Sequence, residues 1–202
     1  MSRGRPRQFD PETALEQALA VFMRDGFERA SVQELADCME ICKPSLYAAY
    51  GNKEALFIEA LRLYARRGAE ARRALLEREP DSRHAVEALL RHTVAHVTSG
   101  AAAGCLLIGE AASPNSGYSA EVREALMSAM AEGASDLRVR LSRAQDEGQL
   151  PYGSDVEALT HYFGALMAGF AVQARNGATA QELDAVVTSV MQMWAPALSS
   201  RL

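Results

Sequence analysis

The segment from Ser31 to Lys53 constrains the fold of this chain most, because it contains two short helical patterns separated by a three-residue turn. Ser31 is a favourable helix N-cap, and Glu34 completes a capping box for the first helix. Pro44 is tolerated in the first turn of the second helix. Helices this short are not stable alone in water. They therefore need a scaffold, and the outward polar face of the second helix needs a partner.

This layout predicts a helix-turn-helix motif, whose second helix enters the major groove of DNA. Three runs carry a family pattern: Ser31–Ala36 (SVQELA), Lys43–Tyr47 (KPSLY) and Asn52–Leu56 (NKEAL). Together they resemble the TetR family of transcriptional regulators, over about the first sixty residues. Many closely spaced positions match the family pattern, which makes the signal strong, whereas a capping box and a turn alone would be a weak signal.

Two positions depart from the family pattern. Glu40 stands where the family commonly has glycine, so we expect a left-handed residue in the turn at a cost of about 1–2 kcal/mol. Ala48 and Ala49 replace a larger pair that commonly helps to hold the DNA backbone. Part of the usual phosphate contact is therefore missing from this pattern.

Composition favours a helical, globular, cytoplasmic protein. The chain has 202 residues, of which 49% are hydrophobic and 23% charged, and it has few clusters of β-branched residues. We expect no signal peptide, and three cysteines predict no disulfides. The net charge of −5 argues against non-specific coating of nucleic acid. It does not exclude DNA binding, which depends on where the positive charge lies.

The positive charge is concentrated in the first eight residues, which contain Arg3, Arg5 and Arg7 and no acid. Such an arm has too few apolar groups to fold alone. A narrow arginine-rich arm suits the A/T-rich minor groove, where the negative potential is enhanced. We therefore predict that Arg5 and Arg7 contact DNA. The alternative is a disordered, soluble tail.

Helix signals continue along the rest of the chain. Asp10 and Pro11 open a helix that we expect to stop at Gly26, and Asn52 caps a long helix that we expect to reach about Glu79. We predict that this long helix is the mechanical link between the DNA-reading unit and the larger domain. We predict an all-α fold in three parts: a flexible basic arm (1–8), an N-terminal three-helix helix-turn-helix DNA-binding domain (9–52), and a larger C-terminal helical effector-binding and dimerisation domain (53–202).

The last two helical patterns predict a homodimer. Residues 156–174 are apolar almost all round, so that helix should be buried on both sides, and its apolar run is shorter than the ~20 residues that span a membrane. A second stripe runs to Pro196, which we expect to end it. A two-fold homodimer through 155–176 and 181–195 accounts for both helices, and the resemblance implies the same four-helix interface. The alternative is an interior helix of a monomer.

Base contacts are assigned by position on the motif. A two-fold dimer presents two reading helices to major grooves ~34–36 Å apart or a multiple of that, so the predicted partner is double-stranded DNA with an inverted-repeat operator. Lys43 is a candidate for guanine edges and Gln33 for adenine edges. Tyr47 can meet a thymine methyl group or a phosphate, and Pro44 offers apolar contact. The alternatives are an exposed glutamine and a packing tyrosine.

Phosphate contacts are predicted for Ser31, Ser45 and Lys53. Lys53 begins a helix, whose N-terminus adds its own partial positive charge. The alternative for Lys53 is a solvated surface charge.

The resemblance also implies a signal site in the larger domain. Ligand binding there shifts the spacing of the two reading heads, which works only if the ligand favours one spacing over the other. The predicted function is therefore a DNA-binding regulator, a repressor released from its operator by an unknown small molecule.

Cysteine and histidine residues offer further candidate sites. Cys105, in the run GCLLI, resembles the reactive cysteine of electrophile- and oxidant-sensing members, so a thiol sensor is an alternative to a buried structural cysteine. His92 and His96 share a helix face without an evident third ligand, so we predict no metal or cofactor. Cys38 and Cys42 are expected to pack in the support of the motif.

An enzyme is not predicted, because the chain lacks a nucleophile elbow, zinc-ligand spacing, a phosphate loop and a dinucleotide fingerprint. A helical interaction protein that does not bind DNA remains the other alternative.

Overall fold

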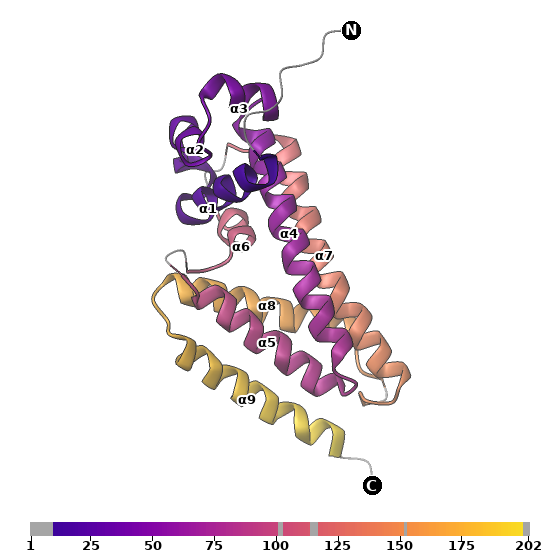
Figure 1. Ribbon diagram of the computed structural model, residues 1–202. Coiled ribbons are helices and arrows are strands. Elements are labelled where there is room, and N and C mark those ends of the chain that lie inside the picture. Colours follow the sequence, from indigo (N-terminus) through magenta and orange to yellow (C-terminus); the bar gives the residue numbers. More distant parts are fainter. Residues whose placement is uncertain (1–9, 101–102, 114–116, 152, 200–202) are drawn as a thin grey trace.

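The computed structural model describes residues 10–100, 103–113, 117–151 and 153–199, and the regular secondary structure in these residues is helical. The predicted all-α fold class is confirmed. Figure 1 shows α1, α2 and α3 gathered at one end of the long helices α4 and α7, with α5, α8 and α9 toward the other end. The helices are α1 (Pro11–Arg29), α2 (Val32–Cys38), α3 (Lys43–Tyr50), α4 (Lys53–Arg78), α5 (Ser82–Thr98), α6 (Leu106–Ala111), α7 (Ala120–Asp146), α8 (Val156–Arg175) and α9 (Ala180–Ser199).

Side-chain caps fix where the helices of the motif and its link begin. The Asp10 carboxylate accepts a hydrogen bond from the backbone N–H of Glu12 at 3.2 Å, ahead of the proline in the first turn of α1. Asn52 Oδ1 accepts one from the N–H of Ala55 at 2.7 Å. From there α4 runs unbroken for 26 residues. It therefore begins directly after the predicted boundary at residue 52, and the division of the chain into domains stays a prediction.

The two predicted helix stops behave differently. Gly26 has φ 76° and ψ 173°, a conformation that glycine adopts readily, and it interrupts α1 as expected before a short helical piece ends at Arg29. Pro196 does not end α9, which continues to Ser199, so that prediction was wrong. The fixed φ of proline is compatible with a helix, even though the residue removes one backbone donor.

One core cluster lies beneath the motif and draws on distant parts of the chain. Leu35 of α2 and Leu46 of α3 are completely buried in it. Phe57 of α4, Leu106 of α6 and Tyr118, just before α7, belong to the same cluster. The scaffold that the two short helices need is therefore supplied by α1 together with α4, α6 and the start of α7.

The second core cluster surrounds α5. Helices α4, α7, α8 and α9 all contact α5, which buries Val86, Leu89 and Leu90 among them. Phe163 and Phe170 of α8 are buried in the same cluster. The larger domain thus has its own apolar interior.

Helices α8 and α9 leave an apolar face uncovered in the single chain. Tyr162 is 46% exposed, Val172 48% and Met193 64%. A Cβ atom added at Gly164 would meet no other atom within 4 Å. The expected burial of α8 on both sides is therefore not achieved within one chain. None of the described helices is long and apolar enough to cross a membrane.

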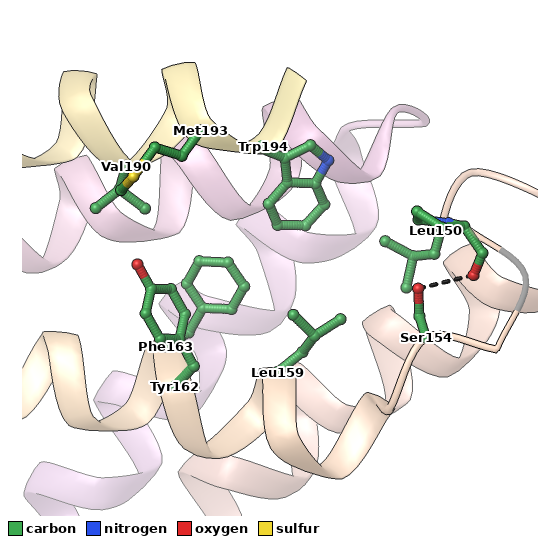
Figure 2. A pocket seen from close by; sticks show the side chains of 9 residues that line it. Leu150, Ser154, Leu159, Tyr162, Phe163, Val190, Met193 and Trp194 are labelled. Carbon is green, nitrogen blue, oxygen red and sulfur yellow. Dashed lines mark hydrogen bonds between the residues drawn. The ribbon is translucent and has the colours of Figure 1, made fainter. Parts of the chain in front are cut away.

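A pocket of about 370 Å³ opens on this face between α8 and α9. Figure 2 shows Phe163 facing Val190 and Trp194 across the space, with Leu150 near one end. The lining residues carry no charged side chain. Tyr162 lines the pocket and also belongs to the uncovered face, so the pocket and the face are continuous.

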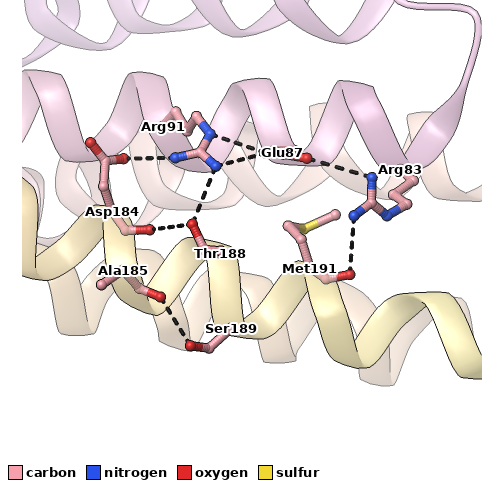
Figure 3. A network of polar contacts seen from close by, with 8 residues as sticks. All are labelled: Arg83, Glu87, Arg91, Asp184, Ala185, Thr188, Ser189 and Met191. Atoms are coloured by element: carbon pink, nitrogen blue, oxygen red, sulfur yellow. Dashed lines mark hydrogen bonds and ion pairs between the residues drawn. The ribbon is translucent and has the colours of Figure 1, made fainter.

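A polar network fastens α9 to α5 (Figure 3). The Arg91 guanidinium donates hydrogen bonds to Glu87 at 2.8 Å within α5 and to Asp184 of α9 at 3.3 Å. Arg83 donates to the carbonyl oxygen of Met191 at 3.3 Å. These contacts lie on the side of α9 that packs against its own chain, so the uncovered face is presented on a fixed helix.

Candidate nucleic-acid interface

The turn between α2 and α3 is held by backbone hydrogen bonds of the Schellman type. The N–H of Ile41 donates to the carbonyl oxygen of Ala36 at 3.0 Å, and that of Glu40 donates to Asp37 at 3.1 Å. Glu40 has φ 53°, so the left-handed residue expected in this turn is confirmed. A residue with a side chain adopts this conformation at a cost of about 1–2 kcal/mol.

The exposed face of α3 carries the side chains that suit DNA. Leu46 is fully buried and anchors the helix, whereas Lys43 and Pro44 are exposed and Tyr47 is 47% exposed. Figure 1 places α3 at the outer end of the molecule. A cation, an apolar ring and a phenol on one short helix can contact base edges, thymine methyl groups and phosphates.

Three other predicted DNA contacts already have partners inside the motif. Ser31 Oγ accepts the backbone N–H three residues later at 3.1 Å, which is the N-cap bond of α2. Gln33 Nε2 donates to Asp37 Oδ1 at 2.7 Å. Ser45 Oγ lies 3.2 Å from the sulfur of Cys42. The bond to Asp37 engages one of the two N–H groups of the Gln33 amide.

Lys53 folds back on α1. Its Nζ donates to the carbonyl oxygen of Glu28 at 3.4 Å and lies 4.4 Å from the centroid of the Phe27 ring. Burial lowers the pKa of the Lys53 ammonium, and the carboxylates of Glu28 and Glu110 oppose that shift. Lys53 is therefore an ordered cation at the N-terminus of α4, and the alternative of a freely solvated charge does not describe it.

Positive charge is scarce in the described part of the motif. Acids outnumber bases between residues 10 and 52, and Arg24, one of the few bases, is paired with Asp25 and Glu34. Arg5 and Arg7, which we predicted to contact DNA, lie outside the described residues.

The three cysteines are free but differ in their surroundings. Cys38 packs against the first core cluster as expected. Cys42 is exposed at the N-cap of α3, so the prediction that it packs was wrong; it lies in the turn, outside the apolar spacing of either helix. Cys105 is partly buried and accepts a hydrogen bond from the Tyr64 hydroxyl at 3.3 Å, and that hydroxyl lies 3.0 Å from His96 Nε2. Burial raises the pKa of Tyr64.

A buried carboxyl group, which the sequence pattern did not predict, lies beneath the motif. Glu110 of α6 is 8% exposed and accepts hydrogen bonds from the N–H of Phe27, at 3.0 Å, and from the Tyr118 hydroxyl. The available signal was a single acid within the apolar run from Cys105 to Ala112. Within the described ranges, no group of three histidine, cysteine or acidic side chains is placed to hold a metal ion.

Family models match nearly the whole chain. Residues 14–60 match the model of bacterial regulatory proteins of the tetR family, and residues 66–190 match a tetracyclin repressor-like C-terminal domain. The first range contains α2, the turn and α3, and the second contains α5 to α8.

Two relatives from Escherichia coli (strain K12) are transcriptional repressors of the helix-turn-helix type. ComR is 31% identical over 200 residues, which cover 96% of this chain and 92% of ComR. BdcR is 38% identical over 108 residues, which cover 52% of this chain and 54% of BdcR.

Solved structures agree with these relatives. A cysteine mutant of the TetR-family regulator CifR, solved with a 26-bp operator DNA, is 39% identical and superposes with a TM-score of 0.87, covering 95% of this chain and 100% of the CifR chain. The reduced form of E. coli NemR, 21% identical with a TM-score of 0.77, covers 90% of this chain and 95% of its own and shares the fold. The chain therefore belongs to the TetR family of bacterial regulatory proteins, and it is a DNA-binding transcriptional regulator.

Proposed function

We propose that this regulator is a cytoplasmic repressor that binds an inverted-repeat operator as a two-fold homodimer and leaves it when a small molecule binds. The observation that carries the proposal is the exposed face of α3, with Lys43, Pro44 and Tyr47 on a helix anchored by buried Leu46. The names of ComR and BdcR support repression, and the operator complex of CifR supports the DNA partner. All are regulators, and we assign the chain no catalytic step.

The dimer is proposed to form through the uncovered face of α8 and α9. Tyr162, Val172 and Met193 leave a row of apolar groups exposed on two helices that the α5 network holds in place. Gly164 allows another backbone to approach closely. An isologous two-fold interface would bury this face on both subunits and would close the mouth of the pocket beside Tyr162.

Base reading is assigned to the exposed side chains of the motif. Lys43 donates to guanine O6 and N7, and Gln33 exchanges its bond to Asp37 for one to an adenine edge. Tyr47 contacts a thymine methyl group or a phosphate, and Pro44 adds apolar contact.

Phosphate contacts are assigned to Ser31, Ser45 and Lys53, with Arg5 and Arg7 reaching the minor groove. Lys53 has the best support among these, because its position on Phe27 keeps a cation beside the N-terminus of α4.

Release is assigned to a ligand-dependent change in the spacing of the two reading heads. Helix α4 suits this role, because its first turn carries Lys53 while its body packs against α5 and α7 of the larger domain. A ligand that binds one spacing more tightly than the other shifts the population toward it.

Selection of bound duplexes from a random DNA pool tests the proposal. We expect an inverted repeat with half-sites one helical turn apart, or a multiple of that. Lys43→Ala and Gln33→Ala should each change the preferred base at one position of the half-site. Arg78→Ala, at the far end of α4, is the control and should leave the preference unchanged. A uniform loss of affinity across all sequences would assign Lys43 and Gln33 to the DNA backbone instead.

A second candidate function is thiol sensing through Cys105, favoured by the hydrogen bond that it accepts from Tyr64. The test must allow for Cys42, which is exposed within the reading motif and would block DNA binding if alkylated. In a Cys42→Ser background, N-ethylmaleimide should abolish operator binding, and Cys105→Ser should restore it. Resistance of the Cys42→Ser protein would rule the sensor out.

A further inference from the structure

Glu110 of α6 holds the point where α1 is broken. Its Oε1 accepts the N–H of Phe27 at 3.0 Å, and this N–H follows directly on the non-helical Gly26. Its second oxygen accepts the hydroxyl hydrogen of Tyr118. Figure 1 shows α6 against α1 at the end of the molecule that carries the motif. A side chain of the larger domain thus satisfies a backbone donor of the DNA-binding domain.

The chain is shaped to admit this carboxylate. A Cβ atom added at Gly26 would lie 2.8 Å from Glu110 Oε1, and the φ of +76° at this position disfavours any side chain. Glycine is therefore needed both for the break and for the close approach of Glu110. A carboxylate with 8% exposure is costly to bury, so the two hydrogen bonds that Glu110 accepts offset part of this cost.

The Phe27–Glu28 segment, which Glu110 contacts, also contacts Lys53. Lys53 Nζ lies 4.4 Å from the centroid of the Phe27 ring and donates to the carbonyl oxygen of Glu28 at 3.4 Å. From the other side, the N–H of Gly117 donates to the Glu28 carboxylate at 3.3 Å. Phe27 and Glu28 therefore lie between the region around α6 and the first residue of α4.

Aromatic contacts make this arrangement rigid. The Phe27 ring packs against Phe57 of α4 with centroids 4.9 Å apart and against Tyr118 with centroids 5.4 Å apart. Phe57 and Tyr118 are stacked at 6.4 Å. The Tyr118 ring thus supports Phe27 while its hydroxyl holds Glu110, so α6 and the Phe27 segment are expected to move together.

We propose that Glu110 is a positioning residue for operator binding, which fixes the Phe27–Glu28 segment and through it places Lys53 at the DNA backbone. The proposal rests on the proposed phosphate contact of Lys53. It assigns to α6 of the effector domain a direct mechanical connection to one DNA-contacting side chain.

A double-mutant cycle on operator affinity tests the proposal, with the full-length dimer and the selected inverted repeat. Glu110→Ala should weaken binding roughly three- to thirtyfold while the protein stays folded by circular dichroism. Glu110→Gln keeps an oxygen acceptor for the Phe27 N–H and should retain most of the affinity. In a Lys53→Ala background, Glu110→Ala should have little further effect, because the residue on which it acts is gone.

A control separates positioning from stability. Leu141→Ala removes a fully buried side chain of α7 in the other core cluster, so it should lower the melting temperature without changing operator affinity. If Glu110→Ala does not fold, Tyr118→Phe removes one hydrogen bond to the same carboxylate and should weaken binding in the same direction.

The outcomes are distinguishable. Wild-type affinity in folded Glu110→Ala would overturn the inference, as would an equal loss in the presence and absence of Lys53. An unchanged affinity in Lys53→Ala would also overturn it while leaving the operator proposal intact. Failure of the wild-type protein to bind any selected duplex would instead remove the proposed function itself.

Discussion

The Nε of Arg140 in α7 donates a hydrogen bond to the carbonyl oxygen of Leu76 in the last turn of α4, at 3.1 Å. Its Nη2 donates to the carbonyl oxygens of Glu79 at 3.3 Å and Pro80 at 3.0 Å. The last carbonyl groups of a helix have no partners within the helix, and here the buried guanidinium supplies donors to that of Leu76 and to those of the two residues that follow α4. The end of α4 remote from the DNA-reading motif is thereby fixed to α7.

We expect Arg140→Ala to lower the free energy of unfolding by about 2–4 kcal/mol, because it removes a buried side chain and the donor to the carbonyl groups of Leu76 and Glu79; the carbonyl oxygen of Pro80 keeps Gln149 as a donor. Urea unfolding at a fixed protein concentration measures this, since the stability of a dimer depends on concentration. Arg138→Ala is the control. Arg138 lies at the surface of α7 and pairs with Glu157 of α8, so its substitution should cost much less than that of Arg140. Equal losses from the two variants would contradict the role given to Arg140.

The left-handed residue of the helix-turn-helix motif gives a second prediction. Glu40→Gly should raise the free energy of unfolding by up to about 1 kcal/mol, because glycine adopts φ 53° without the steric cost. The gain is limited because glycine has more freedom in the unfolded chain. Glu40→Ala keeps the Cβ atom and is the matched control. Thermal unfolding that ranks alanine at or above glycine would contradict a steric cost of the Cβ atom at this position.

The motif could be predicted from the sequence because its signals are local. The Ser31 N-cap, the break at Gly26 and the left-handed Glu40 each depend on residues within one helical turn of themselves. Signals of this kind depend only on residues that are close in sequence, so they can be recognised before the fold is known.

The contacts beneath the motif could not be predicted in this way. Glu110 and the N–H of Phe27 are 83 residues apart, and no periodicity joins them. The contact of Lys53 with the Phe27 ring depends on how that ring packs against Phe57, which the local sequence does not give. Helix spacing gives the face on which a side chain lies; it does not give what another segment places against that face.

The arm can be tested through the salt dependence of operator binding. Arg5→Ala combined with Arg7→Ala should make the slope of log affinity against log salt concentration less negative by roughly 2, one for each lost contact. The effect should be clear because acids outnumber bases in the motif between residues 10 and 52. Arg62→Ala, an exposed arginine paired with Glu59 on α4, should leave the slope unchanged. An unchanged slope in the arm variant would mean that Arg5 and Arg7 do not contact the DNA.

The ionisation of Glu110 gives a pH dependence whose sign can be worked out. Burial raises the pKa of Glu110 above its ordinary value of 4.5, and the neighbouring Glu28 carboxylate adds to the shift. The N–H of Phe27 and the cations Arg175 and Arg29 oppose it. The folded protein therefore binds the proton more tightly than the unfolded chain. The stability that follows is fully present below pH 4.5 and is lost as the pH rises through the raised pKa.

The glutamine of Glu110→Gln cannot ionise. The free energy of unfolding of this variant minus that of the wild type should therefore increase as the pH rises from 4.5, and this difference should level off above the raised pKa. Urea unfolding at a series of pH values up to neutrality measures the difference. Glu121→Gln, in the first turn of α7, is the control with the opposite sign. Backbone and Ser119 hydrogen bonds lower the pKa of the exposed Glu121, so this substitution should matter above pH 4.5 and lose its effect as the pH falls. If both variants followed the same curve, the Glu110 carboxyl group would not be ionising in a buried site.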